Sequence, residues 1–518
     1  KTLNCRKLCK CFLVGKGKDM EHKCNCTNHG SEIEESSEAV SGAVCNAKET
    51  QLHWPTSYFI QTYGCQMNVY DSEIIGALLE ERGCHQAPEE SQADIVVFNT
   101  CCIRDNADQK VYGRMGDFKV LKEKNPNFML VIAGCLAQKD KQVLVERFPQ
   151  IDIVLGTHQV KRLPEYVDAI LANRVALAEL KAKAKTSAQA NRNFRQAKKE
   201  LGSGLVKVEK KGNHLALKAC PSSTFMAMVP ISVGCNQWCT YCIVPHVRGP
   251  LQSRPIQDVI TEVSRLVKGG FKDITLLGQN VNDYGRDLRI EEGFAQLLKE
   301  LTPEKVGRFR LRFTSPHPAY FTQAAIEAMA ANPNVCPQVH LPLQSGDDRI
   351  LEVMHRRYNS REFLDLVKRM RQAIPNLCIT TDIIVGFADE TEEEFQHTLD
   401  VVRAAKFDTA FMFAYSERPG TPGSQFANRV PEDIRMDRLH KLIEVQNEIS
   451  EELNKSRVGQ EVEVLIEGPS KKNANRYTGR SPQHWLVHVD SQEDITGQLV
   501  KVRLDESYMW GFTGSLVK

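Results

Sequence analysis

The chain has 518 residues, of which 42% are hydrophobic, and its net charge is only +2. This length predicts about three domains. The balanced charge gives no overall electrostatic signature, and the lack of 18 consecutive apolar residues predicts that no segment spans a membrane. Seventeen cysteines without a signal peptide argue against a secreted disulfide protein and indicate the reducing cytoplasm.

Residues 1–55 differ in character from the rest of the chain. Six cysteines lie there with His22 and His29 among Gly, Ser, Lys and Glu residues, without sustained periodicity. These side chains could bind a metal, but no standard zinc-finger spacing occurs. We expect a disordered, cysteine-containing extension to which the sequence assigns no role.

Residues 56–172 alternate between strand-like and helix-like segments, which predicts a parallel α/β domain. The expected strands cover residues 58–62, 94–98, 128–133 and 152–155. Ligands bind at the carboxyl ends of such strands, where Cys65, Cys101 and Cys135 follow the first three. Three thiols at one edge predict a three-thiolate 4Fe-4S site, although each could instead be a buried filler. Cys102 should point away from Cys101 along an extended backbone.

Residues 173–224 form a basic segment that we interpret as a linker. The stretch 174–218 holds twelve Lys and Arg residues against three Glu. Abundant Ala, Lys and Gln favour a single helix over residues 176–201. A basic run is most often a solvated face, and contact with nucleic-acid phosphates is the main alternative.

Residues 225–455 predict a partial (β/α)6 barrel. Strand-like runs recur with helical segments between them, at residues 226–233, 273–277, 308–313, 338–343, 378–385 and 409–414. The active sites of barrels lie in the loops that follow the strands. The loop after the first strand should therefore lie at the mouth of this barrel.

That loop carries Cys235, Cys239 and Cys242 at C-x3-C-x2-C spacing. Three thiolates hold three corners of a 4Fe-4S cubane and leave its fourth iron open. The known chemistry that pairs this spacing with an open iron is reductive cleavage of S-adenosylmethionine (SAM). A zinc site would normally recruit a fourth ligand nearby, for which His246 is the only candidate.

Two further loops of the barrel carry residues that could bind SAM. Gly278, Gln279 and Asn280 follow the second strand, and Gly386 follows the fifth. Glycine permits close approach of a ligand to the backbone, and the two amides could bond the amino and carboxylate groups of SAM. Ordinary turn preferences explain these residues equally well.

Residues 456–518 predict a small antiparallel β-barrel with strands at 462–466, 485–489, 499–504 and 511–517. We expect a long loop over residues 468–480. Its cations suit an RNA backbone and its aromatic neighbours suit base stacking, although a plain solvated loop is an equal alternative. The residues concerned are Lys471, Lys472, Arg476, Arg480, Tyr477 and Trp485.

Several motifs over residues 57–517 resemble the methylthiotransferases, a radical SAM family. They include Tyr63-Gly64-Cys65-Gln66-Met67-Asn68, Asn99-Thr100-Cys101, Gly134-Cys135 and Cys235-x3-Cys239-x-Tyr241-Cys242-Ile243-Val244-Pro245. The run Gly-Cys-Gln-Met-Asn is similar to the MiaB branch, the tRNA 2-methylthio-N6-isopentenyladenosine synthases. The order of the parts also matches: a methylthiotransferase domain, a radical SAM barrel and a C-terminal TRAM domain. Residues 386–391 depart from the family pattern, because Ala388 and Asp389 stand where Pro and Gly are more usual.

The resemblance implies a cytoplasmic enzyme with two 4Fe-4S clusters. The first is held by Cys235, Cys239 and Cys242 and cleaves SAM, whereas the auxiliary cluster at Cys65, Cys101 and Cys135 serves sulfur insertion. The implied reaction is methylthiolation of C2 of N6-isopentenyladenosine 37 in the tRNA anticodon loop, with two SAM consumed per turnover. An electron donor such as flavodoxin or ferredoxin, an unidentified sulfur donor and a monomeric state are expected.

Alternatives of two kinds stay open at this point. The same chemistry acts on a ribosomal-protein aspartate in the RimO branch and on threonylcarbamoyl-adenosine in the MtaB branch, and Gln66-Met67-Asn68 argues against both. From a different class, the chain could be an RNA-binding protein with structural zinc and no catalysis.

Overall fold

The computed structural model describes residues 53–101, 105–125, 127–184, 187–201, 204–208, 221–470 and 473–517. Nearly all of the expected extension therefore lies outside the described residues, as do Cys102, Lys471 and Lys472. Residues 51–518 form one compact unit.

The N-terminal domain is built on a six-stranded parallel sheet with strand order β2-β1-β3-β4-β5-β6. The strands are β1 (Ser57–Tyr63), β2 (His85–Gln86), β3 (Ile95–Thr100), β4 (Met129–Gly134), β5 (Ile153–Leu155) and β6 (Leu205–Lys207). Central strands β3 and β4 are buried along their whole length, as expected for Val- and Ile-rich strands covered on both faces. The predicted parallel α/β domain is confirmed.

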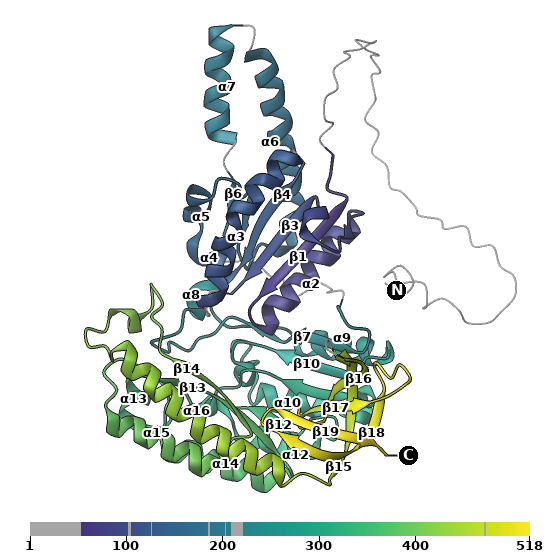
Figure 1. Cartoon of the computed structure of the whole chain (residues 1–518), viewed down its shortest axis with the longest axis vertical. Helices are drawn as coiled ribbons and strands as arrows, with labels where there is room; N and C mark the ends of the chain where they lie inside the picture. The colour runs from purple at the N-terminus through teal and green to yellow at the C-terminus, as the bar shows by residue number, and fades with distance from the viewer. Residues whose placement is uncertain are drawn as a thin grey trace, which may run out of the picture. The chain divides into compact units, whose positions relative to one another are not determined.

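Helices cover both faces of this sheet (Figure 1). Helices α2 (Gln66–Glu81) and α6 (Leu163–Ala184) pack on one face with Ile95, Val97 and Val131. The other face packs Val96 and Phe98 against helices α3 (Asp105–Lys124), α4 (Cys135–Asp140) and α5 (Gln142–Arg147). This alternation of residues between two cores follows from the period of two along a strand.

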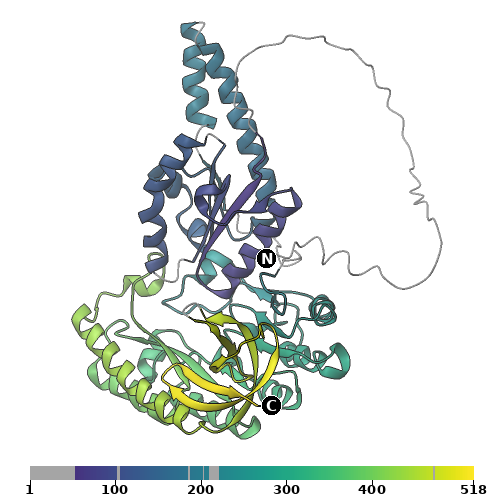
Figure 2. The same ribbon diagram turned by 45° about the vertical axis from the view of Figure 1, so that its right-hand side comes forward.

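The basic segment forms two helices, not the single linker helix that we predicted. Helix α6 is followed by α7 (Ala188–Leu201), and the two lie side by side in Figures 1 and 2. The side-chain oxygen of Ser187 accepts a hydrogen bond from the Ala190 amide and so starts the second helix. Strand β6 then pairs in parallel with β5. The segment is thus an excursion from the first sheet that returns to its edge.

The central domain has six parallel strands in two groups of three. Strands β7 (Met226–Pro230), β10 (Asp273–Leu277) and β11 (Arg310–Phe313) form the first group, and β12 (Gln338–His340), β13 (Cys378–Val385) and β14 (Thr409–Ala414) form the second. A parallel bridge between Leu311 and Val335 continues the first group toward the second. This arrangement confirms the predicted partial barrel.

Helices enclose the outer face of this barrel around one large hydrophobic core. They are α9 (Ile256–Lys268), α10 (Gly293–Glu300), α11 (Pro303–Val306), α12 (Gln323–Ala331), α13 (Asp348–Val353), α14 (Ser360–Ala373), α15 (Glu392–Ala405) and α16 (Glu432–Lys455). Helices α14 and α15 both start with a capping box, at Asn359 and Thr391. The short elements β8 (Ser232–Val233), α8 (Val244–Arg248) and β9 (Gln252–Ser253) lie around the cysteine loop.

The C-terminal domain is a closed five-stranded barrel with strand order β15-β16-β17-β19-β18. Its strands are β15 (Glu461–Ser470), β16 (Asn473–Arg480), β17 (Leu486–Asp490), β18 (Leu499–Tyr508) and β19 (Gly511–Leu516). The small barrel is confirmed, with one parallel pair, β17 and β19, among antiparallel ones. The predicted loop over residues 468–480 is wrong, because these residues lie largely in paired strands β15 and β16.

Candidate active site

The first three strands of the N-terminal sheet bring Cys65, Cys101 and Cys135 together. Tyr63 of β1 lies opposite Thr100 of β3, which lies opposite Gly134 of β4, so the three cysteines follow at one sheet edge. The Cys101 side chain is hydrogen-bonded to both other thiols. We call Cys65, Cys101 and Cys135 the N-terminal triad.

Neighbouring residues fix the backbone at this triad. Gly134 has φ +88°, and a Cβ there would lie 2.6 Å from the Thr100 carbonyl oxygen, so a larger residue would not fit. Asn68 donates from its side chain to the Asn99 side chain at 3.0 Å, and its own side-chain oxygen lies 3.4 Å from the Cys65 sulfur. The Asn of the Gln-Met-Asn run therefore supports the thiol that precedes it.

The thiols of the N-terminal triad share their protons unequally. The hydrogen bond with Cys101 lowers the pKa of Cys65 to about 6, and the positive charge of Arg248 acts in the same direction. The pKa of Cys101 is raised because its proton is held between Cys135 and Cys65. One thiolate therefore forms readily in this triad, and thiolates are the form that binds metal.

Arg248 is the residue at this site that the sequence analysis missed. Its Nη2 lies 2.8 Å from Oδ2 of Asp71 and 3.4 Å from the side-chain oxygen of Asn68, and it also hydrogen-bonds Cys135. Both members of the Arg248–Asp71 pair are almost fully buried. Burial raises the pKa of Asp71 to about 6, with Arg248 opposing that rise.

Helix α8, which ends at Arg248, joins the two halves of the site. The Val247 carbonyl accepts a hydrogen bond from the Thr157 hydroxyl at 2.8 Å. Ile243 and Val247 form a small core with Cys135. Since Cys242 is only six residues before Arg248, a single short segment connects both sets of cysteines.

The barrel loop holds Cys235, Cys239 and Cys242, which we call the barrel triad. The Cys242 amide donates to the Cys239 carbonyl at 3.0 Å and closes a tight turn. Nη1 of Arg356 lies 3.6 Å from the Cys239 sulfur. Burial raises the pKa of Cys235 to about 11 and that of Cys242 to about 12, while Arg356 acts in the opposite direction.

Contacts with the second half of the barrel position this loop. The Thr240 amide donates to the Met354 carbonyl, the Thr240 carbonyl accepts from the Gly423 amide, and the Tyr241 ring packs against Phe387.

Among the described residues, no group of three His, Cys, Asp or Glu side chains is arranged so that it could hold a metal ion without rearrangement.

The predicted SAM-binding residues have different surroundings. The side-chain oxygen of Gln279 accepts a hydrogen bond from the Gly234 amide, so it anchors the cysteine loop. Asn280 is buried, and neither atom of its side-chain amide has a hydrogen-bond partner among the residues that the structure describes. A Cβ at Gly278 would lie 2.7 Å from the Ser232 hydroxyl, which explains the glycine.

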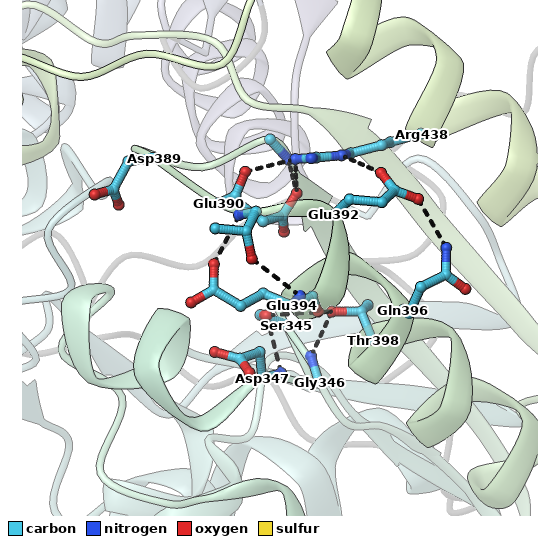
Figure 3. Close-up of polar contacts among 12 residues, drawn as sticks. Ser345, Gly346, Asp347, Asp389, Glu390, Glu392, Glu394, Gln396, Thr398 and Arg438 are labelled. Atoms are coloured by element: carbon cyan, nitrogen blue, oxygen red, sulfur yellow. Dashed lines mark hydrogen bonds and ion pairs between the residues drawn. The ribbon is translucent and has the colours of Figure 1, made fainter.

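The loop after β13 is held by a buried carboxylate (Figure 3). Glu390 accepts from the Gly386 amide at 2.7 Å and from Arg438 at 2.9 Å, and Arg438 also reaches Glu392. The Gly386 amide is therefore occupied within the protein. Asp389 pairs with Arg349 at 3.0 Å, so the departure from the family pattern adds an exposed ion pair beside this loop.

We expect Glu390→Gln to flatten the pH dependence of stability. Burial raises the pKa of Glu390 from 4.5 to about 7, so the unfolded state loses this proton first as the pH rises. Stability should then fall between about pH 4.5 and pH 7 in the parent protein. Thermal unfolding midpoints at pH 5, 6, 7 and 8 measure the effect. Glu392→Gln, which changes the other acid at Arg438, is the control, and equal slopes in parent and Glu390→Gln would contradict the assignment.

The C-terminal barrel changes the interpretation of the predicted RNA-binding residues. Arg476 pairs with Asp490 at 2.9 Å, and Arg480 pairs with Glu467 at 3.0 Å. The two aromatic side chains belong to the barrel core, so Tyr477 and Trp485 are packing residues, and the base stacking that we considered for them is not supported. Contact of Arg476 and Arg480 with RNA stays a prediction.

Comparisons with known proteins assign the two triads to two recognised regions. Residues 57–156 match the uncharacterized protein family UPF0004, and residues 229–402 match the radical SAM superfamily. The tRNA-2-methylthio-N(6)-dimethylallyladenosine synthase of Carboxydothermus hydrogenoformans is 41% identical over 464 residues, covering 89% of this chain and 99% of that protein. The chain belongs to the radical SAM methylthiotransferase family.

Further relatives agree with this assignment. The synthase of the same name from Corynebacterium glutamicum strain ATCC 13032 is 43% identical over 452 residues, covering 86% of this chain and 81% of that protein. Among solved structures, the radical SAM methyltransferase TsrM from Kitasatospora setae has a similar fold, with a TM-score of 0.50 at 14% identity over 71% of this chain and 77% of that one. This radical SAM methylthiotransferase is thus an enzyme whose family implies SAM and a 4Fe-4S cluster. None of its helices in the described ranges is long and apolar enough to cross a membrane.

Proposed function

We propose that this methylthiotransferase converts N6-isopentenyladenosine 37 of tRNA into its 2-methylthio derivative, with two SAM consumed per turnover. The printed names of the relatives support this substrate. The observation that carries the proposal is the link between the triads, because α8 connects Cys242 to the Arg248–Asp71 pair beside Cys135. Sulfur insertion needs a radical source and a sulfur source near the same carbon.

We assign a 4Fe-4S cluster to each triad, and the surroundings of the thiols fit such groups. An iron–sulfur cluster with three thiolates carries negative charge, and a guanidinium lies beside each triad, Arg356 at Cys239 and Arg248 at Cys135. Cys235, Cys239 and Cys242 would hold the cluster whose chemistry would be the one-electron reduction of SAM. The chain's part is to hold these groups and the base in one site.

The unpaired amide of Asn280 supports a SAM site at the barrel mouth. A buried amide without partners is costly, and the donor and acceptor of Asn280 can be satisfied by the amino and carboxylate groups of SAM. Gln279 has a positioning role instead, because its side-chain oxygen already binds Gly234. Gly386 contributes through its lack of a side chain, since a Cβ there would collide with Arg435.

An apolar strip on the inner face of β14 fits the isopentenyl group. The side chains of Phe411 and Phe413 are 51% and 41% exposed, while neighbouring Ala410 packs into the outer core. Phe413 lies opposite Ile384, which packs in the same group as Tyr241 of the cysteine loop. The strip therefore begins beside the barrel triad.

We expect Phe411→Ala and Phe413→Ala each to raise the KM for isopentenylated tRNA about tenfold, since each removes apolar contact area worth on the order of 1.5 kcal/mol. Steady-state kinetics with purified isopentenylated tRNA measure this. Val120→Ala, at an exposed apolar residue of α3 in the other domain, is the control. An unchanged KM in both Phe variants would show that the strip does not contact the substrate.

The test of the proposed function is nucleoside analysis of tRNA. A host strain that lacks 2-methylthio-modified adenosine is compared with and without this chain. The appearance of 2-methylthio-N6-isopentenyladenosine supports the proposal. A methylthio derivative of threonylcarbamoyl-adenosine in its place would assign the chain to the MtaB branch. The remaining parts of the proposal are a cytoplasmic monomer and an electron donor of the flavodoxin or ferredoxin class.

A further inference from the structure

Helix α7 presents a basic face away from its partner helix. The residues that face α6 recur at helical spacing and are half-buried: Ala190, Phe194, Ala197 and Leu201. At 100° per residue, Arg192, Arg195 and Lys199 fall on the opposite side of the helix. All three are exposed, and they span eight residues, or about 10 Å of helix.

No acidic side chain in the described part of the chain pairs with this face. Within the described ranges, Arg192, Arg195 and Lys199 have no ion pair; Arg192 only donates to the Gln189 side chain at 2.8 Å. The acid of this helix, Glu200, lies on another side and bonds Gln196. Like charges at these spacings repel one another. A cation in the last turn is favoured by the helix dipole, but Arg192 and Arg195 are too early in α7 for that benefit.

The base of the hairpin is firmly attached to the sheet that carries the N-terminal triad. Leu163 and Val167 of α6 are fully buried in the sheet core. Arg174 binds Asp152 at 2.9 Å and the Phe128 carbonyl at 2.8 Å. The chain that leaves α7 re-enters the sheet as β6. The basic face is thus held by a packed element at both ends of the hairpin.

We propose that Arg192, Arg195 and Lys199 of α7 bind phosphates of the tRNA body, outside the anticodon loop. This inference rests on the proposed function and names a contact surface for its substrate. The chemistry is charge complementarity, since an exposed row of unpaired cations matches a polyanionic backbone. It also gives a role to the excursion between β5 and β6, which the barrel site does not use.

The test compares full-length tRNA with an anticodon stem-loop, both carrying isopentenyladenosine. The triple variant Arg192→Gln, Arg195→Gln, Lys199→Gln keeps good helix formers and removes three charges. We expect its affinity for full-length tRNA to fall about tenfold or more. The slope of log affinity against log salt should become shallower by roughly 0.7 to 0.9 per lost contact. The KM and kcat for the stem-loop should be unchanged.

The matched control removes three exposed cations that are already ion-paired: Arg403→Gln, Lys441→Gln, Lys455→Gln. It changes the net charge equally, so a similar loss of tRNA affinity in the control would overturn the proposal. An equal loss on the stem-loop would also overturn it, because the contact would then be with the loop. If the triple variant binds tRNA as the parent does but no longer binds an acidic protein partner, the basic face is a protein-binding surface and the proposal is overturned. If the parent enzyme modifies neither RNA, the proposed function fails independently of this surface.

Discussion

Replacing Cys101 by Ala should abolish methylthiolation while SAM cleavage to 5'-deoxyadenosine stays measurable. Cys101 is the central thiol of the N-terminal triad, hydrogen-bonded to both others, and the barrel triad keeps its three ligands. Fully loaded enzyme should contain about eight iron atoms and the variant about four, because each cubane depends on its own thiolates. Iron analysis and product assays with isopentenylated tRNA measure both effects. Cys239→Ala should also halve the iron, but it should abolish SAM cleavage as well as methylthiolation.

Cys84→Ala is the control for this substitution. Cys84 is also a buried thiol of the N-terminal domain, but it donates to the Pro55 carbonyl at 2.9 Å and lies away from the triad. The Cys84→Ala variant should keep the full iron content of the parent enzyme. If Cys102→Ala loses iron and Cys101→Ala does not, the choice of ligand is wrong.

Arg248→Ala should destabilise the protein and should also abolish methylthiolation, for which the auxiliary cluster is needed. Removing one partner of a buried ion pair leaves an uncompensated charge and costs about 3 to 5 kcal/mol, here the charge of Asp71. Without the guanidinium the pKa of Asp71 should rise above its present value of about 6. The variant should therefore lose more stability at pH 8, where the carboxyl must ionise, than at pH 5. Thermal unfolding at the two pH values measures the difference.

The double variant Arg248→Met, Asp71→Leu separates stability from function. Apolar residues in place of a buried pair often restore or improve stability. We expect its unfolding midpoint to recover while the spectrum of the auxiliary cluster and the methylthiolation rate stay altered. Full recovery of both would limit Arg248 to a structural role.

The elements that the sequence predicted well are those with a strong local signal. Strands β10, β13 and β14 have the predicted bounds, because short, mostly apolar runs between helical segments allow few alternatives. The convergence of Cys65, Cys101 and Cys135 followed from one rule, that parallel strands end at the same edge of a sheet. Both depend only on residues close in sequence and on sheet topology.

The wrong and missed predictions concern residues whose structural role depends on partners that local sequence patterns do not show. Gly468 and Pro469 indicated a loop, but they lie at irregular pairings of β15 with β16, where a sheet tolerates both residues. The break between α6 and α7 contains no Gly or Pro in its described part, and Ser187 was the available signal. Arg248 has its partner Asp71 far away in sequence, and no spacing rule connects them.

The position of α8 has a thermodynamic consequence for cofactor assembly. This helix has five residues, follows the barrel triad directly, and packs on the first turn of α4, where Cys135 lies. A group bound at either triad restricts the same short segment, so the second group meets a segment that is already ordered. Occupancy of the two triads is then coupled, and linkage requires the coupling to be equal in both directions. Loading the N-terminal triad should tighten iron retention at the barrel triad by the same factor as the reverse.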